Sequence, residues 1–343
     1  MPKSTLYAII NDTQKIFLFI IISKETYMFI LPYIFLAIGF FALIKGADFF
    51  VDGASSIAKK LGIPDLIVGL TIVAMGTSAP ELATSISAAL GGSSDIAVGN
   101  VVGSNILNIL IILGLSALIK PLHVDKDMFK RDIPVMLISA AMLPILTFIG
   151  KYKLNFISGL IFVAFFIFYI YLTIRAALKY KKEHADEEPD ETIKSFPWWK
   201  SILLTVSGAL IIIVGAHFSV ESAIIIAKSW GVGEDVIGLT VVALGTSLPE
   251  LITSVVAAKK GNSDIALGNI VGSNIFNILF ILGTTLLISQ VSVPFPSFID
   301  GCVMVGFSAY LAITALTGKK LSRIEGASYL VLYVGYAVYL FIR

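Results

Sequence analysis

Apolar stretches of about 20 residues recur along the whole chain and are separated by short polar segments. Runs of this length are typical of membrane-spanning helices, because about 20 apolar residues are needed to cross the hydrocarbon core of a bilayer. The pattern predicts ten such helices, over residues 29–51, 64–90, 95–119, 132–150, 154–178, 199–229, 234–258, 264–289, 297–317 and 322–342. We therefore expect an all-α polytopic membrane protein.

Residues 1–27 do not follow this pattern. Their apolar run, Ile16–Ile22, is too short to span a membrane, and no small-residue cleavage site follows it. The clean hydrophobic pattern begins at Met28. We interpret residues 1–27 as an N-terminal extension, either a surface segment or a stretch that precedes a true start at Met28.

The chain contains an internal duplication. Residues 46–119 align with residues 215–288 at a constant offset of 169 without a gap, and 44 of the 74 aligned positions are identical. Similarity of this kind is the mark of a repeated structural module. A long polar segment between the copies has the composition of a solvated linker. We predict a first five-helix repeat over 28–178, a linker over 179–198 and a second five-helix repeat over 199–343.

The number of spans in each repeat determines the topology. Five is odd, so the second repeat enters the membrane from the opposite side, as in the inverted repeats of many secondary transporters. If the linker is inside, the inward loops carry 17 lysine and arginine residues and the outward side at most 7. Positive charge is retained on the cytoplasmic side. We therefore expect a cytoplasmic linker and two outside termini, in the inner or plasma membrane of the cell.

Composition agrees with an integral membrane protein. The chain is 57% hydrophobic and only 14% charged, and its mean hydropathy is +0.92. Soluble domains have about 25% charged residues. The formal net charge of +2 is too small to indicate a nucleic-acid partner. The single cysteine, Cys302, excludes an internal disulfide.

Two related motifs lie inside the predicted spans. GTSAPE occupies Gly76–Glu81, and GTSLPE occupies Gly245–Glu250. Pro80 has no N–H group and its ring clashes with the carbonyl group of Gly76, so a helix must bend there. Backbone groups freed at membrane depth are tolerated only where they are buried in protein or line a polar cavity. The motifs therefore predict bent helices that border a polar cavity.

The same motifs gather oxygen ligands. Glu81 follows Thr77 by four residues, so both lie on one helix face, and Ser78 adds a hydroxyl group. The second motif repeats this set with Thr246, Ser247 and Glu250. Two carboxylates in an apolar medium need compensating charge, and neither motif contains lysine or arginine. Two glutamates balance one divalent cation, and oxygen-only ligation suits calcium rather than zinc or copper.

Amide and hydroxyl groups follow in the next predicted span of each repeat. GNVVGSNILN covers Gly99–Asn108, and GNIVGSNIFN covers Gly268–Asn277. Their glycines permit close helix approach or local unwinding. Polar side chains recur at intervals of four residues, namely Asn100, Ser104, Asn108, Asn269, Ser273 and Asn277. Their neutral oxygens suit monovalent cations. A packing role is the alternative, but intramembrane carboxylates are rarely retained without a function.

GTSxPE followed by GNxxGSNxxN, present twice and inverted, resembles the alpha repeats of the calcium/cation antiporter (CaCA) superfamily. Within it, the motifs are most similar to those of prokaryotic sodium/calcium exchangers. The resemblance extends from Met28 to the end of the chain. It implies ten helices, of which the second, third, seventh and eighth enclose the ion sites. It also implies that the first and sixth helices slide across a fixed core.

The resemblance further implies which groups bind the ions. A calcium site would use Glu81 and Glu250 with the carbonyl oxygens of Thr77 and Thr246. Sodium sites would use the same glutamates with oxygens of Ser78, Ser104, Ser247, Ser273, Ala74 and Ala243. Some archaeal relatives have aspartate at the position of Asn277, which is neutral here, as is Asn108.

These observations together predict a secondary active antiporter that exchanges calcium for sodium by alternating access. Its partners are the two ions and the lipid bilayer, it needs no cofactor, and we expect it to function as a monomer. A proton/calcium exchanger and a potassium-dependent sodium/calcium exchanger are alternatives, and a cation channel is a different class. We do not expect an enzyme, because Ser78 and Ser247 have no histidine nearby in the sequence to act as a base.

Overall fold

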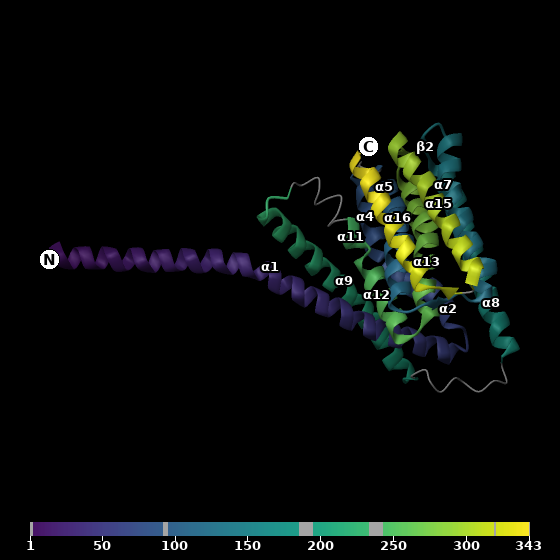
Figure 1. Cartoon of the computed structure of the whole chain (residues 1–343), viewed down its shortest axis with the longest axis horizontal. Helices are drawn as coiled ribbons and strands as arrows, with labels where there is room; N and C mark the ends of the chain where they lie inside the picture. The colour runs from purple at the N-terminus through teal and green to yellow at the C-terminus, as the bar shows by residue number, and fades with distance from the viewer. Residues whose placement is uncertain (1–2, 92–94, 185–194, 233–242, 319, 343) are drawn as a thin grey trace.

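The structure is a computed structural model that describes residues 3–91, 95–184, 195–232, 243–318 and 320–342. Most of these residues are helical, as Figure 1 shows, which confirms the all-α prediction. The first half comprises α1 (Lys3–Leu61), α2 (Asp65–Val68), η1 (Gly69–Val73), α3 (Ala74–Thr77), α4 (Ala79–Leu90), α5 (Asp95–Leu107), η2 (Asn108–Ile112), α6 (Leu113–Ile119), η3 (Met128–Asp132), α7 (Ile133–Ile149) and α8 (Phe156–Glu183). The second half comprises α9 (Trp198–Ser229), α11 (Ala243–Thr246), α12 (Leu248–Lys260), α13 (Ser263–Phe276), η5 (Asn277–Leu282), α14 (Gly283–Ile288), α15 (Phe295–Gly318) and α16 (Arg323–Ile342).

Seven of the described helical segments are long and apolar enough to cross a membrane, and the bent pair Asp65–Thr77 and Ala79–Leu90 makes an eighth. The seven are Ile30–Leu61, Ile96–Ile119, Met128–Ile149, Phe156–Glu183, Trp198–Ser229, Ser263–Ile288 and Phe295–Leu316. The eight segments coincide with eight of the predicted spans. The predicted span over 234–258 falls partly outside the described residues, and α16 occupies the last one with 20 residues. The chain is therefore a multi-pass membrane protein.

The predicted boundaries of the two repeats and the linker stay predictions, but the structure shows where two of the helices near them begin and end. The α1 helix begins at Lys3, so residues 3–27 continue into the first span without a break, and Figure 1 shows them extending away from the bundle. The α8 helix continues to Glu183, into the predicted linker. Most of the remaining linker, residues 185–194, lies outside the described residues.

The centre of the bundle is formed by the helices that carry the asparagine-rich motifs. Every residue from Ile265 to Phe276 in α13 is buried. On the α5 side, Val101 and Ile106 are fully buried, as is Ile109 in η2. Peripheral helices instead expose large apolar side chains, as expected for surfaces that face lipid. The polar residues of α5 and α13 are thus held at the core of the protein.

Two short antiparallel strand pairs join the two halves of the chain. β1 (Leu122–His123) pairs with β4 (Lys320–Leu321), and β2 (Lys153–Leu154) pairs with β3 (Val291–Ser292). Each pair takes one strand from each half. The sequence does not predict these strands, because two residues are too few to show a periodic pattern.

Helices α1 and α9 pack against each other and lie side by side in Figure 1. Glycines allow their backbones to approach closely. A Cβ atom at Gly46 would lie 2.9 Å from the amide nitrogen of Ile212, and one at Gly208 would lie 2.5 Å from that of Phe50. Any larger residue would separate the two backbones, so α1 and α9 form one tightly packed unit.

We expect Gly208→Val to loosen this unit and destabilise the protein. The added atoms would meet the α1 backbone, which cannot move aside as a flexible side chain could. Overpacking of this kind costs roughly 1–3 kcal/mol. Thermal unfolding in detergent should show a melting temperature several degrees below that of the wild type. Gly335→Val is the control, because no atom lies within 4 Å of a Cβ at that position. Equal melting temperatures for the two variants would contradict the close packing.

Candidate ion-binding site

Both GTSxPE motifs interrupt their helices at the serine. Ser78 separates α3 from α4 with φ −83° and ψ 10°, and the two flanking segments are bent by 47°. Ser247 separates α11 from α12 with φ −88° and ψ 5°. The following proline lies in the first turn of the new helix, where its missing N–H group is tolerated. The predicted bend is therefore confirmed at Pro80, and a matching break occurs before Pro249.

The two breaks bring each glutamate to the serine of the other motif. The Ser78 hydroxyl donates to Glu250 Oε1 at 2.7 Å, and the Ser247 hydroxyl donates to Glu81 Oε1 at 3.3 Å. Both glutamates are 1% exposed. Each also lies in the first turn of its helix, α4 or α12, where the helix dipole stabilises negative charge. Residues 172 and 166 positions apart in the chain thus form one site.

A second layer of the site consists of asparagines from α5, α13 and the π-helical turns that follow them. Asn108 Nδ2 donates to Asn274 Oδ1 at 3.1 Å, and Asn277 Nδ2 donates to Asn105 Oδ1 at 3.1 Å. Asn105 Nδ2 also donates to the carbonyl oxygen of Asn274 at 3.2 Å. These crossed bonds join the two helices. They use the amide nitrogens of Asn108 and Asn277, so the amide oxygens of these two residues have no hydrogen-bond partner among the described residues.

Asn100 and Asn269 hold the broken helices in place. Asn100 Nδ2 lies 3.1 Å from Ser85 Oγ, and Asn269 Nδ2 lies 2.9 Å from Ser254 Oγ. The same nitrogens donate to the carbonyl oxygens of Glu81 and Glu250, at 3.4 and 3.3 Å. Because these two asparagines bind the backbone carbonyl groups of the glutamates themselves, they help to fix the positions of the two carboxylates.

The two threonines of the motifs have different surroundings. Thr77 Oγ1 donates to Asn269 Oδ1 at 3.0 Å, whereas Thr246 Oγ1 has no hydrogen-bond partner among the described residues. The site is therefore not symmetric in the conformation described here, although its two halves have matching sequences.

Six buried oxygens of these motifs have no hydrogen-bond partner among the described residues. They are Glu81 Oε2, Glu250 Oε2, Asn108 Oδ1, Asn277 Oδ1, Thr246 Oγ1 and Ser273 Oγ. A buried polar atom without a partner is unfavourable by about 1–3 kcal/mol, and by more when it is charged. Two carboxylates with neutral amide and hydroxyl oxygens are the ligands that calcium and other hard cations prefer. The arrangement can therefore bind cations through oxygen atoms.

The remaining predicted ligands lie at or beside this cluster. Thr77, Ser104 and Ser273 are buried, with exposed fractions of 1%, 3% and 0%. The Ala74 carbonyl oxygen accepts hydrogen bonds from the Ser78 amide at 3.0 Å and from the Thr77 hydroxyl at 3.3 Å. For Ala243 the structure gives its place as the first residue of α11. The ion-binding roles of all twelve residues stay predictions.

Four residues that shape the site were not among the predicted ligands, namely Ser85, Asn105, Ser254 and Asn274. Their spacing in the sequence could have identified them. Ser85 and Ser254 lie four residues after the glutamates, and Asn105 and Asn274 lie three before the predicted asparagines. Both pairs also match at the repeat offset of 169. Their hydrogen bonds cross between elements far apart in the chain, which a single sequence does not reveal.

Fold and site together define a multi-pass membrane protein with a buried, oxygen-lined polar centre built from two repeated motifs. The family model for "Sodium/calcium exchanger protein" matches residues 31–175 and 200–342, which is most of the chain. The chain belongs to the sodium/calcium exchanger protein family. Members of this family are membrane ion exchangers, so the chain is a transporter and not an enzyme, as predicted.

Individual relatives agree with this assignment. The sodium/calcium exchanger MaX1 of Methanosarcina acetivorans is 38% identical, over 92% of this chain and 99% of its own length. CaxA of Alkalimonas amylolytica is 39% identical, over 90% and 98% of the two chains. Among solved structures, the sodium-calcium exchanger NCX_Mj soaked without sodium and calcium matches with a TM-score of 0.79 and 33% identity. That match covers 91% of this chain and 99% of NCX_Mj.

Proposed function

We propose that this chain exchanges calcium for sodium across the cell membrane by alternating access. The observation that carries the proposal is the crossed contact between the two motifs, in which each serine hydroxyl donates to the glutamate of the other repeat. This contact unites two carboxylates in one buried site, where a divalent cation balances their charge. The relatives MaX1 and NCX_Mj are named sodium/calcium exchangers, which supports the same ions here.

The two ions share the glutamates and therefore compete. In the calcium-loaded state, Glu81 and Glu250 would provide the charged ligands, with oxygens of Thr77 and Thr246 beside them. In the sodium-loaded state, serine and asparagine oxygens would spread several ions around the same carboxylates. Because both loads require these carboxylates, calcium and sodium cannot fill the site together.

The electrostatics of the empty site would enforce exchange rather than leak. To change sides, the protein must pass through a closed state in which the site is dehydrated. Without cations, that state would bury two uncompensated carboxylates, and burial of an uncompensated charge costs several kcal/mol. Either load compensates the charge and permits the change of side. The tight α1 and α9 unit supports a rigid element that moves against the central helices.

We further propose a topology of ten spans in two inverted five-helix repeats. Three observations support it: the gap-free sequence duplication, the odd number of spans in each copy, and the strand pairs that join the two halves. The excess of lysine and arginine on the linker side supports a cytoplasmic linker and two outside termini. The central position of the ion site within one chain is compatible with function as a monomer.

The test is calcium uptake into proteoliposomes under separately imposed gradients. Vesicles loaded with sodium and diluted into sodium-free medium should accumulate calcium, and vesicles with only a proton gradient should not. The neutral oxygens of the site motivate this expectation, because protons would need only the two glutamates. Calcium flux that ignores sodium and follows pH would instead identify a proton/calcium exchanger. Flux that also requires potassium would identify a potassium-dependent exchanger.

Asn277→Asp should change the sodium dependence more than the calcium transport. The substitution removes the donor that reaches Asn105 Oδ1 and adds a third acidic group, one oxygen of which takes the place of the unpartnered Asn277 Oδ1. More negative charge should lower the sodium concentration that gives half-maximal exchange, by roughly tenfold for about 1.4 kcal/mol of added attraction. Asn108→Asp is the matched variant in the other repeat and should act in the same direction. An unchanged sodium titration in both variants would remove these asparagines from the site.

A further inference from the structure

The ion site presents amide oxygens only if two buried asparagine side chains face the right way. The oxygen and nitrogen ends of an asparagine amide have nearly the same shape, so hydrogen bonding decides where each end lies. Asn108 and Asn277 each donate through Nδ2 to another asparagine, and each leaves Oδ1 without a hydrogen-bond partner among the described residues. Rotation of either amide by half a turn would put an N–H group in place of that oxygen, and an N–H group repels a cation.

The hydrogen bonds that start at Asn108 end at a sulfur atom. Asn108 Nδ2 donates to Asn274 Oδ1 at 3.1 Å, and Asn274 Nδ2 donates to Met136 Sδ at 3.7 Å. Met136 belongs to α7 and is 0% exposed. A thioether has no hydrogen to donate, so it can only accept. To keep both bonds, Asn274 must therefore turn its nitrogen toward Met136 and its oxygen toward Asn108.

The hydrogen bonds that start at Asn277 end at a backbone carbonyl group instead. Asn277 Nδ2 donates to Asn105 Oδ1 at 3.1 Å, and Asn105 Nδ2 donates to the carbonyl oxygen of Asn274 at 3.2 Å. A carbonyl oxygen is likewise an acceptor only. Both series of bonds therefore have an atom that only accepts at one end, and for this reason both have a free amide oxygen at the other.

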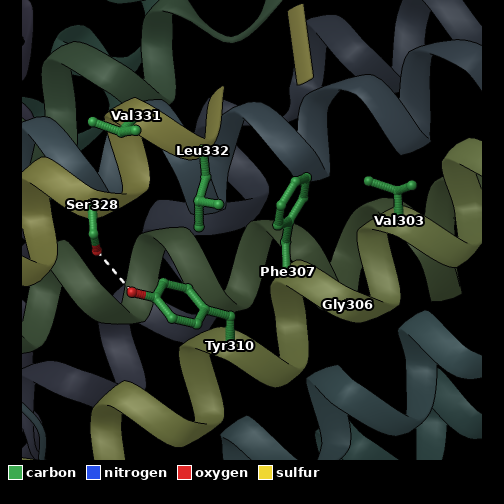
Figure 2. A pocket seen from close by; sticks show the side chains of 7 residues that line it. All are labelled: Val303, Gly306, Phe307, Tyr310, Ser328, Val331 and Leu332. Carbon is green, nitrogen blue, oxygen red and sulfur yellow. Dashed lines mark hydrogen bonds between the residues drawn. The ribbon is translucent and has the colours of Figure 1, made fainter. Parts of the chain in front are cut away.

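The second half has a methionine at the corresponding position, Met304 of α15. Each methionine follows the buried aspartate of its own helix segment, Asp132 or Asp300, by four residues. Met304 is also 0% exposed, but no hydrogen bond to its sulfur is found in the part of the chain that the structure describes. Its neighbour Val303 lines a groove of about 680 Å³ between α15 and α16, shown in Figure 2, and Met304 does not. Met304 is thus a buried methionine without the hydrogen bond.

We propose that Met136 is a positioning residue of the ion site, which acts through Asn274 to keep the amide oxygen of Asn108 available to the cation. Its sulfur sets the orientation of two amides in a row. That orientation decides whether the site presents an oxygen or an N–H group at Asn108. The role rests on the proposed exchange function, because it takes Asn108 Oδ1 as a sodium ligand.

Met136→Leu removes the acceptor and keeps the side-chain volume, an exchange that protein cores tolerate well. Without the sulfur, Asn274 and Asn108 can rotate together, and Asn108 would present its oxygen for only part of the time. The sodium concentration that gives a half-maximal effect should rise roughly two- to fivefold, near the lower end for a lost hydrogen bond because a thioether is a weak acceptor. The maximal rate of exchange should not change, because saturating sodium still loads the site.

Two titrations of the full-length protein measure this effect. Melting temperature against sodium concentration in detergent reports binding, because a ligand of the folded state stabilises it. Calcium uptake into proteoliposomes against internal sodium concentration reports exchange. Both titrations should shift for Met136→Leu, and neither should shift for the control Met304→Leu. Equal shifts in the two variants, or no shift in Met136→Leu, would overturn the proposal. A lower melting temperature without sodium and an unchanged sodium titration would show that Met136 serves packing only.

Double variants show whether Met136 acts through the amide of Asn108. In the Asn108→Asp background, a carboxylate presents an oxygen in either orientation, so the addition of Met136→Leu should not raise the half-maximal sodium concentration. In the Asn277→Asp background, Asn108 is still an amide, so Met136→Leu should raise that concentration by the same factor as in the wild type. A rise of equal size in both backgrounds would contradict a role through Asn108.

The binding titration separates this proposal from the proposed exchange function. If sodium stabilises the wild type but does not drive calcium uptake, the exchange function is wrong, and the melting curves of the variants still decide the role of Met136. If exchange is observed and both titrations of Met136→Leu match those of the wild type, the exchange function stands and the role of Met136 is wrong. If sodium neither stabilises the wild type nor drives calcium uptake, both are wrong.

Discussion

Glu81→Gln and Glu250→Gln should each abolish calcium transport. Glutamine has nearly the same shape and can still accept the hydrogen bond that Ser247 or Ser78 donates. The substitution therefore removes charge while it preserves packing. A single carboxylate cannot balance a divalent cation in a buried site, and loss of one partner from a buried charge interaction costs about 3–5 kcal/mol. Calcium uptake should fall by roughly a factor of 100 or more.

The measurement is sodium-driven calcium uptake into proteoliposomes at matched protein content. Glu183→Gln is the control, because Glu183 is an exposed residue at the end of α8, far along the chain from both motifs. Its uptake should equal that of the wild type. Thermal unfolding of all three variants should be recorded, so that loss of transport is separated from loss of fold. Wild-type calcium flux in either site variant would exclude the paired-carboxylate site.

The central break in the fold was predictable because it has a local cause. A proline in a helix interior kinks or breaks the helix, and here the break lies at Ser78, two residues before Pro80. The membrane-spanning helices were equally predictable from hydrophobic runs of about 20 residues, because the thickness of the membrane sets the length of such runs. The convergence of the two motifs followed from the duplication, because equivalent elements of two repeats meet at the axis between them.

The detailed contacts of the site were not predictable in the same way. The register at which α5 meets α13 decides that Asn108 reaches Asn274 and that Asn277 reaches Asn105. That register depends on the packing of many apolar residues and leaves no local sequence pattern. The different surroundings of Thr77 and Thr246 depend on one conformation of the protein, whereas the two sequences around them are alike.

Sodium-driven calcium accumulation should depend on membrane voltage. Calcium brings two positive charges to a site with two negative ones. The site also offers neutral oxygens at Asn108, Asn277, Thr246 and Ser273 beside the two carboxylates. If three sodium ions leave a vesicle for each calcium ion that enters, one positive charge is exported per cycle. That charge is worth roughly 2.3 kcal/mol per 100 mV, or about a fiftyfold change in the accumulation ratio of calcium.

Sodium-loaded proteoliposomes with valinomycin and chosen potassium gradients provide the measurement, in strongly buffered solutions of equal pH on both sides of the membrane. An inside-positive potential should raise the steady-state calcium accumulation, and an inside-negative potential should lower it. A calcium leak would respond with the opposite sign, because an inside-positive potential expels free calcium. Protein-free vesicles measure that leak. Sodium-driven accumulation that is indifferent to voltage would indicate two sodium ions per calcium ion, since such a cycle moves no net charge.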